Sequence, residues 1–264
     1  MNSGLGRQKE SFDRVADDYA AFRTTPPREV FDALVEASGV RTGSRVLEIG
    51  CGTGQLSVPL ADLGVELIAV ELGPRLAALA RRNLEQYPQA RVLVSSFEEW
   101  QLPDRKFDAV ICASAFHWLD PELRYAKSAA ALHPGGALAL LQLHYVRGGT
   151  EGFFTDTQPY YRRWGLSDDP MFELPDPNEL PASYPELDER LEFRDVERYR
   201  FEIPMRHTTA SYVGWLRTDS LVNSLDANSR AEFLAEMKRL IALRYHGAVE
   251  RNLLYELIVA KRPS

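Results

Sequence analysis

A short hydrophobic run that leads directly into three alternating glycines constrains this chain more than any other feature. Residues 46–49 read Val-Leu-Glu-Ile, a pattern typical of a buried strand, and Gly50, Gly52 and Gly54 follow before a helical pattern that ends at Leu63. Glycine lets the backbone adopt positive φ and approach a ligand closely, while the next helix offers unpaired N–H groups at its N-terminus. The loop therefore predicts a nucleotide-binding turn at the carboxyl end of a strand.

The segment from Arg45 to Leu143 alternates such short strands with helices. Strands are predicted at 46–49, 67–70, 91–94, 107–112 and 137–143, and Pro74 and Asp120-Pro121 are expected to open helices. This alternation predicts an α/β fold in which right-handed crossovers build a parallel sheet that helices cover on both faces.

The two ends of the chain depart from this alternation. A helical leader is predicted from Ser11 to Phe22, and Pro26-Pro27 opens a second helix. Beyond Thr150, many aromatics and prolines predict a long irregular crossing. Strands at 196–203 and 253–260 then bracket a helical insertion, whose second helix is expected to start at a Ser229–Glu232 capping box and end at Gly247.

We accordingly divide the chain into a leader or lid (1–44), a core (45–144), and a cover (145–264) that returns two strands to the same sheet. These three segments form one elaborated domain.

Composition narrows the function. The 264 residues carry 31 Lys and Arg against 38 Asp and Glu, a net charge of −7, which argues against binding to nucleic acid or anionic membranes. Cys51 and Cys112 are too few for a disulfide framework or a zinc cluster, so no metal site is expected. No signal peptide or membrane span is visible, which predicts a cytoplasmic protein. Nothing in the sequence indicates the oligomeric state.

An acidic residue supplies the second half of the predicted nucleotide site. Glu71 directly follows the second predicted strand, 17 residues beyond Gly54, about where such folds place a carboxylate that binds ribose hydroxyls. The dinucleotide fingerprint would need Gly or Ala at the position of Gln55 or Ser57, depending on which glycine starts the count. This spacing disfavours an NAD-linked oxidoreductase.

The order Glu48-x-Gly50-x-Gly52-x-Gly54, with Glu71 downstream, resembles the class I S-adenosylmethionine-dependent methyltransferases. Further points of resemblance are Phe107-Asp108-Ala109-Val110, the Pro134-Gly135-Gly136 turn, and an antiparallel pair of strands at the end of the chain. The resemblance implies a doubly wound, mostly parallel seven-stranded Rossmann-like sheet with an antiparallel last strand. It also implies S-adenosylmethionine as cofactor and S-adenosylhomocysteine as its product.

The same resemblance implies roles for individual residues. Glu48 would hold the methionine amino group, directly or through water; the Gly50–Gly54 backbone would lie against methionine and ribose; and Leu72 would pack on the adenine. Ser96 stands where the family usually has an adenine-binding Asp, so this task would fall to the Ser96 hydroxyl, the Phe97 backbone N–H or Glu98. The complete set of expected cofactor-binding residues is Tyr19, Arg23, Glu48, Gly50, Cys51, Gly52, Thr53, Gly54, Glu71, Leu72, Ser96, Phe97, Glu98, Ala113 and Ser114.

The segment Phe116-His117-Trp118 resembles a small-molecule subgroup that includes the trans-aconitate methyltransferases, in which it lies beside the transferable methyl group. The leader, with Phe12, Tyr19 and Arg23, resembles the lid of that subgroup. His117 is the candidate catalytic base, since its ordinary pKa is about 6.5. The alternative is a buried histidine that positions Trp118. A carboxylate acceptor would need no base, and Arg23 could orient it.

We therefore expect an enzyme that transfers a methyl group to oxygen, nitrogen or carbon of a small-molecule acceptor, with carboxylates among the candidates, by in-line displacement. A non-catalytic S-adenosylmethionine-binding module is the alternative. The aromatics between Phe153 and Trp164 either line an acceptor pocket or pack the crossing itself.

Overall fold

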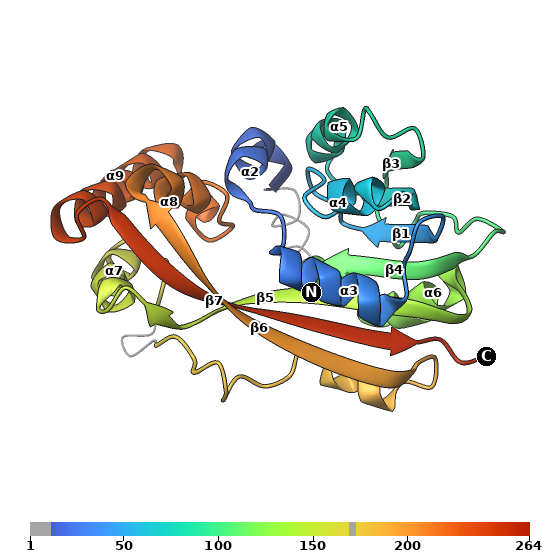
Figure 1. Ribbon diagram of the computed structural model, residues 1–264. Helices are drawn as coiled ribbons and strands as arrows, with labels where there is room; N and C mark the ends of the chain where they lie inside the picture. The colour runs from blue at the N-terminus through green and yellow to red at the C-terminus, as the bar shows by residue number, and fades with distance from the viewer. Residues whose placement is uncertain (1–11, 169–172) are drawn as a thin grey trace.

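A single seven-stranded sheet organises the computed structural model, which describes residues 12–168 and 173–264. The strand order is β3-β2-β1-β4-β5-β7-β6 (Figure 1). The first five strands pair in parallel, whereas β7 runs antiparallel to both β5 and β6. The predicted fold class is confirmed. The strands are β1 (Arg45–Ile49), β2 (Glu66–Glu71), β3 (Ala90–Val94), β4 (Phe107–Ala113), β5 (Leu132–Gly149), β6 (Arg194–Thr208) and β7 (Ala248–Lys261).

Helices flank the sheet and also gather at the far end of its long strands (Figure 1). The helices are α2 (Ala16–Phe22), α3 (Arg28–Ser38), α4 (Ser57–Asp62), α5 (Pro74–Asn83), α6 (Arg124–Ala131), α7 (Phe153–Arg163), α8 (Thr209–Leu216) and α9 (Ala227–Arg244), with short 3-10 turns η1 (Phe116–Trp118), η2 (Pro185–Glu189) and η3 (Val222–Ser224). Among the described residues, none of these helices is long and apolar enough to cross a membrane.

Alternation along the strands builds a core on each face of the sheet. In β1, all of whose residues are buried, Leu47 and Ile49 join a cluster with α6 and η2, whereas Val46 faces α3 and α4. Successive side chains of a strand point to opposite faces, so hydrophobic residues at every position require cover on both sides.

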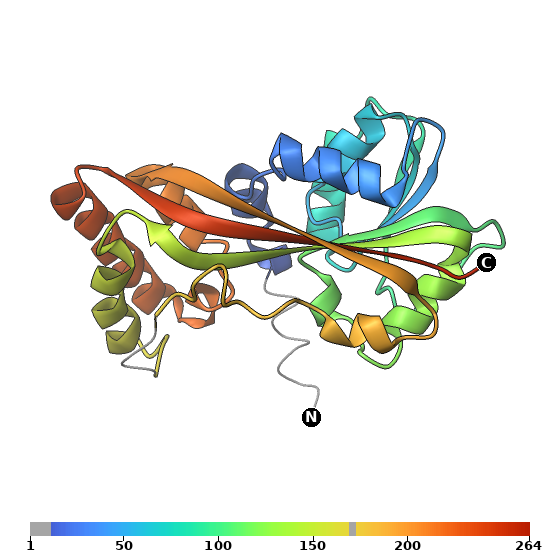
Figure 2. The ribbon, with the colours of Figure 1, turned by 60° about the horizontal axis from the view of Figure 1, so that its bottom comes forward.

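The three strands at one edge are much longer than predicted. The predictions of 137–143 and 253–260 found the buried parts of β5 and β7, because hydrophobicity marks a strand only where it is covered. The prediction of 196–203 found the middle of β6, where side chains alternate between half-buried and exposed. Antiparallel pairing with β7 continues from Ala137 to Gly149 in β5 and from Arg194 to Thr208 in β6. These strands extend beyond the parallel core and carry the group formed by α7, α8 and α9 (Figures 1 and 2).

Three helical predictions need correction. The irregular crossing contains α7, which sequence reasoning missed because Pro159 lies inside the helix. Helix α9 begins before Ser229: the side chain of Asp226 caps it by accepting hydrogen bonds from the N–H groups of Asn228 and Ser229. Helix α6 begins at Arg124 rather than at Pro121. The predicted leader begins at Ser11, which lies outside the described residues, and its last turns form α2.

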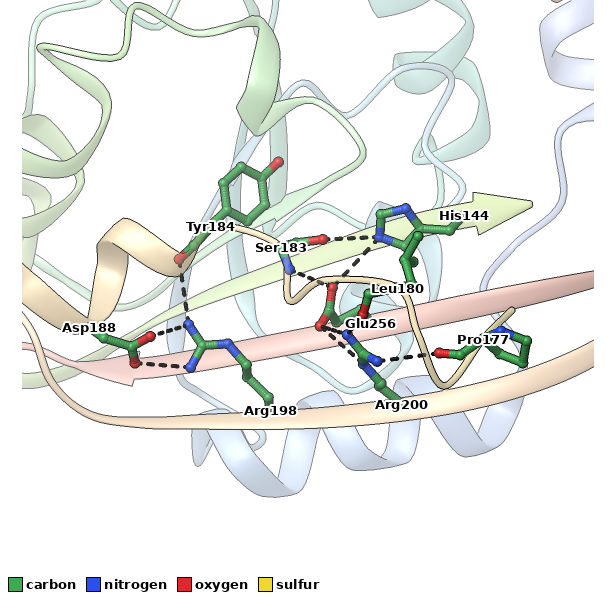
Figure 3. A network of polar contacts seen from close by, with 9 residues as sticks. All are labelled: His144, Pro177, Leu180, Ser183, Tyr184, Asp188, Arg198, Arg200 and Glu256. Carbon is green, nitrogen blue, oxygen red and sulfur yellow. Dashed lines mark hydrogen bonds and ion pairs between the residues drawn. The ribbon is translucent and has the colours of Figure 1, made fainter. Parts of the chain in front are cut away.

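The crossing segment, which connects α7 to β6, is bound to one face of β7 by a network of polar contacts (Figure 3). Glu256 is fully buried, and its carboxylate accepts hydrogen bonds from the Ser183 N–H (2.9 Å) and the Arg200 guanidinium (3.1 Å), with the His144 ring 3.6 Å away. Arg200 also donates to the Leu180 carbonyl, at 2.8 Å. Burial alone would raise the pKa of Glu256, but hydrogen bonds from His144, Ser183 and Arg200 hold it at about 2. The carboxylate is therefore ionised in the folded protein.

Replacing Glu256 by Gln should destabilise the protein, because the Arg200 charge loses its partner in a water-poor site. We expect a loss of about 3 kcal/mol in the free energy of unfolding at neutral pH, measured by urea denaturation. The folded pKa is lowered from 4.5, so this stabilisation is present above that value and is lost as the pH falls towards 2.

The difference between wild type and variant should therefore shrink across that acidic range. The exposed Glu250 on the same strand provides the control, since Glu250→Gln should change stability by less than about 0.5 kcal/mol. Equal losses at the two positions would contradict the assignment.

Candidate active site

Three neighbouring cavities lie at the carboxyl ends of the parallel strands and beneath the helical cover. Cavity A (about 140 Å³) is lined from β2, the segment after β3, and η1. Cavity B (about 120 Å³) is lined from the glycine loop, the segment after α2, and β7, and cavity C (about 460 Å³) from α7, α8 and β7. Cavities A and B share Tyr19, Gly50, Gly52, Ala113 and Ser114. Cavities B and C share Tyr145, Trp215 and Arg251.

The glycine loop forms the boundary between cavities A and B. Gly50, Gly52 and Gly54 have φ values of 69°, 58° and 96°, in the left-handed region that favours glycine. A Cβ atom on Gly50 would lie 2.6 Å from the Ala115 Cβ, and one on Gly52 would lie 3.3 Å from the Tyr19 ring. Residues 50 and 52 must therefore be glycine, because a side chain at either position would collide with Ala115 or crowd Tyr19.

Glu71 ends β2 and lines cavity A. Its carboxylate is 7% exposed and accepts hydrogen bonds from the backbone N–H groups of Gly52 and Gly73, both at 2.9 Å. Burial raises the pKa of Glu71, and these two N–H groups oppose the rise. Each carboxylate oxygen retains a lone pair beyond the one used, so the group can accept further hydrogen bonds from a diol in the cavity. The structure thereby fits the ribose role implied for this residue.

Glu48 is the only acidic side chain among the described residues that line cavity B. It is 2% exposed and accepts a hydrogen bond from the Ser57 hydroxyl at 2.5 Å. Burial raises the pKa of Glu48 to about 7, although the Ser57 hydrogen bond opposes the rise; the nearby Glu71 charge adds to it. A cation entering cavity B would favour the ionised form and bind to it.

The N-terminal segment closes over the glycine loop through contacts that the sequence did not signal. The Asp13 carboxylate accepts hydrogen bonds from the N–H groups of Arg75 (2.7 Å) and Leu76 (3.0 Å), in the first turn of α5. A carboxylate at this place satisfies unpaired N–H groups and complements the helix dipole. Phe12 and Tyr19 both line cavity A, with their rings in edge-to-face contact.

The segment after β3 also reaches cavity A. Ser96, Phe97 and Glu98 all line it, together with Leu72. The Ser96 hydroxyl accepts a hydrogen bond from the Glu99 N–H at 3.2 Å, and Glu98 accepts one from the Asp120 N–H at 3.1 Å. The residues expected to surround an adenine ring are thus brought together at one wall.

Some expected residues lie elsewhere. Thr53 is buried behind the loop, where its carbonyl accepts a hydrogen bond from the Asn83 side chain, and Gly54 faces Ala80 of α5. Neither lines a cavity, whereas Cys51 and Arg23 line cavity B. His117 is outside the lining of all three cavities; its ring contacts that of Trp118, which lines cavity A, at a tilt of 41°. Partial desolvation and the Arg124 charge lower the pKa of His117.

Sequence reasoning missed the contribution of the long strands to the site. Arg251, Leu253 and Tyr255 occupy alternate positions of β7 and line cavity B, with Tyr145 paired opposite Leu253. The alternation of these side chains was visible in the sequence, but the predicted strand began only at Leu253. In residues 12–168 and 173–264, no group of three or more His, Cys, Asp or Glu side chains is placed to hold a metal ion.

Comparisons with known proteins agree with this geometry. Residues 46–136 match a family model described as a methyltransferase domain. The chain is 29% identical over 238 residues to an uncharacterized methyltransferase of Mycobacterium tuberculosis strain H37Rv, covering 88% of this chain and 86% of that one.

Two solved structures resemble the fold. One is described as a type II methyltransferase from Anaeromyxobacter dehalogenans (25% identity, TM-score 0.63), and the match covers 92% of this chain and all of that one. The other is Haemonchus contortus phosphoethanolamine N-methyltransferase 2, solved with phosphomonomethylethanolamine and S-adenosylhomocysteine (17% identity, TM-score 0.57). Here the match covers 96% of this chain and 58% of that one.

The matched segment contains the glycine loop, Glu48 and Glu71, which define cavities A and B. Residues 46–136 therefore form a methyltransferase domain, and the protein is an S-adenosylmethionine-dependent methyltransferase.

Proposed function

We propose that the protein transfers the methyl group of S-adenosylmethionine to a small molecule, and that a carboxylate oxygen is the acceptor atom. The proposal depends on one observation: cavities A and B adjoin each other, because the glycine loop, Ala113 and Ser114 line both. Cavity A has the acid suited to a ribose, and cavity B holds an acid suited to an ammonium group.

In this proposal the donor spans the glycine loop. Glu71 accepts hydrogen bonds from the ribose hydroxyls, the wall around Ser96 and Leu72 receives the adenine, and Glu48 pairs with the methionine ammonium, directly or through water. The bound donor supplies an electrophilic methyl group on a sulfonium. The protein contributes alignment of the acceptor with that group and exclusion of water.

The N-terminal segment, which belongs to residues 1–44, would act as the lid. Asp13 fixes it to α5, and Phe22 packs against α8 so closely that a Cβ on Gly214 would lie 2.3 Å from the Phe22 ring. Tyr19 lines both cavities, so its ring is placed to face the sulfonium through cation–π contact. Closure of this segment would exclude water from the reacting groups.

The lining of cavity B favours an acceptor that arrives already ionised. No histidine belongs to that lining among the described residues, and burial raises the pKa of both Tyr19 and Tyr255. Glu48 is assigned to the ammonium. A carboxylate needs no base: its oxygen forms the new bond to the methyl carbon while the sulfur keeps the electron pair of the broken bond. The products are a methyl ester and S-adenosylhomocysteine.

Removing the Glu71 carboxylate should weaken donor binding. In Glu71→Gln, the ribose hydroxyls and the Gly52 and Gly73 N–H groups lose a charged acceptor. We expect the Kd of S-adenosylhomocysteine, measured by isothermal titration, to rise about tenfold or more, a loss of about 1.4 kcal/mol or more. The exposed Glu85, mutated to Gln, is the control. Unchanged affinity in Glu71→Gln would place the ribose elsewhere.

The raised pKa of Glu48 predicts pH-dependent donor binding. Below about pH 7 the carboxyl is protonated and cannot pair with an ammonium, whose own pKa of about 8 keeps it charged there. Affinity for S-adenosylhomocysteine should therefore rise as the pH increases from about 5.5 to 7.5, by at most about tenfold per unit.

The control is Glu48→Gln, which should bind weakly at both pH values and lose most of this dependence. Any residual slope would belong to Glu71, whose pKa is also raised by burial. Full retention of the wild-type pH dependence in Glu48→Gln would show that another group pairs with the ammonium.

Replacing His117 by Asn should test the base and positioning roles. Because His117 contacts Trp118 without lining a cavity, we expect kcat to fall by less than about tenfold and the pH–rate profile to keep its shape. Trp118→Ala should instead raise the KM for S-adenosylmethionine. A fall in kcat of about 100-fold or more, with loss of a titration near neutral pH, would restore His117 as the base.

A further inference from the structure

Arg251 projects from β7 at the boundary between cavities B and C, and its charge has an unusual environment. Its guanidinium lies 3.8 Å from the centre of the Trp215 ring and 4.8 Å from that of Tyr145. Its hydrogen-bonding partner is the His207 ring, whose Nε2 atom accepts from Arg251 Nη2 at 3.0 Å. Burial and the Arg251 charge lower the pKa of His207 to about 4, so the partner is neutral.

Arg23 brings a second guanidinium to the same place. It donates to the hydroxyl (2.8 Å) and the carbonyl (3.2 Å) of Thr218, and it lies 5.6 Å from the centre of the Trp215 ring. Within residues 12–168 and 173–264, no carboxylate lies within ion-pair distance of either Arg23 or Arg251. Two half-buried cations therefore line cavity B without an anionic partner in the described chain.

Two other arginines with little exposed side chain are neutralised by carboxylates. Arg45 pairs with Glu66 at 2.9 Å, and Arg124 with Glu186 at 2.6 Å. Removing a charge from water without such a partner is costly, so an anionic ligand beside Arg251 would offset that cost. Glu48 does not supply the missing anion, because its carboxyl group is hydrogen-bonded to Ser57 and burial favours its neutral form.

The size and lining of cavity C indicate which kind of group would lie next to an anion bound at Arg251. It has a volume of about 460 Å³, against about 120 Å³ for cavity B, and shares the Arg251, Trp215 and Tyr145 side chains with it. The remaining wall is mainly apolar or aromatic, with Phe153 and Tyr161 from α7 and Leu180 from the crossing segment. A cavity of this size and lining suits a hydrophobic group rather than a second polar one.

We propose that the acceptor is a carboxylic acid with a bulky apolar body, in which Arg251, which lines both cavity B and cavity C, binds the carboxylate and cavity C receives the body. Arg23 lines cavity B alone and is left to the carboxylate of the donor's methionine. The inference rests on the proposed function, because it names the acceptor of that reaction. It assigns to Arg251 the role of the specificity-determining residue. It also excludes small polyacids, which would leave cavity C without a complementary group.

The first test measures binding in the absence of turnover. The protein is saturated with S-adenosylhomocysteine and titrated with decanoate by calorimetry; decanamide lacks the charge, and acetate lacks the body. We expect decanoate to bind at least about tenfold more tightly than either control. Binding of S-adenosylhomocysteine without this preference would overturn the inference and leave the proposed function standing. Failure to bind S-adenosylhomocysteine would overturn both.

The second test uses variants at the boundary. Arg251→Gln should weaken decanoate binding about tenfold or more while leaving S-adenosylhomocysteine affinity within about threefold, and Arg251→Lys, which keeps the charge, should lie between. Arg28→Gln, on the exposed surface of α3, is the matched control and should change neither affinity. Thermal unfolding of each variant checks that the fold is retained. Equal decanoate affinity in the wild type and a folded Arg251→Gln would overturn the role of Arg251.

The third test addresses cavity C alone. Leu221 lines this cavity at a half-exposed position, so Leu221→Trp should fill part of it without disturbing a tightly packed core. We expect this variant to lose affinity for decanoate but to keep its affinity for the shorter hexanoate. An equal effect on the two acids, or none on decanoate, would show that the body binds elsewhere.

Discussion

The antiparallel pairing of β7 with β5 and β6 is the constraint on which the rest of the structure depends. Because successive residues of a strand point to opposite faces, β7 serves two purposes at once. Glu256 points to one face, where it fastens the crossing segment, while Arg251, Leu253 and Tyr255 point to the other and line cavity B. A shift of one residue in this register would exchange the two sets, so the stability of the cover and the chemistry of the site are linked by one hydrogen-bonding pattern.

The glycine loop is held by an interaction that also prepares the site. Glu71 accepts hydrogen bonds from the N–H groups of Gly52 and Gly73, which lie just after the carboxyl ends of β1 and β2. Gly73 immediately precedes α5, and Asp13 reaches across to the first turn of that helix, so the loop, the acid and the N-terminal segment are positioned together. Burial keeps the pKa of both Glu48 and Glu71 raised, an energetic cost that a cationic or hydroxyl-bearing ligand would partly relieve.

The parallel core could be predicted because its signals are local. The alternation of buried runs and glycine or proline punctuation located β1 to β4, and the spacing of Glu48, the glycines and Glu71 located one wall of the site. Long-range contacts left no such signal. Asp13 caps a helix more than sixty residues away in the chain, and α7 was missed because an internal proline normally breaks a helix. The ends of β5 to β7 were missed because their exposed faces carry polar residues.

The part of the site that could be predicted from the sequence is the proposed donor site, and the part that could not is the proposed acceptor site. The proposed donor site consists of the glycine-loop backbone and two acids close to it, so a short sequence motif encodes it. The acceptor site proposed above uses side chains from β5, α8 and β7 that meet only after the sheet is assembled. Arg251 and Arg23, for example, both lie against the indole ring of Trp215. Such a constellation can change with single substitutions while the donor site stays intact. Acceptor specificity must therefore be derived from charges and volumes in the folded protein rather than from the motif that identifies the reaction.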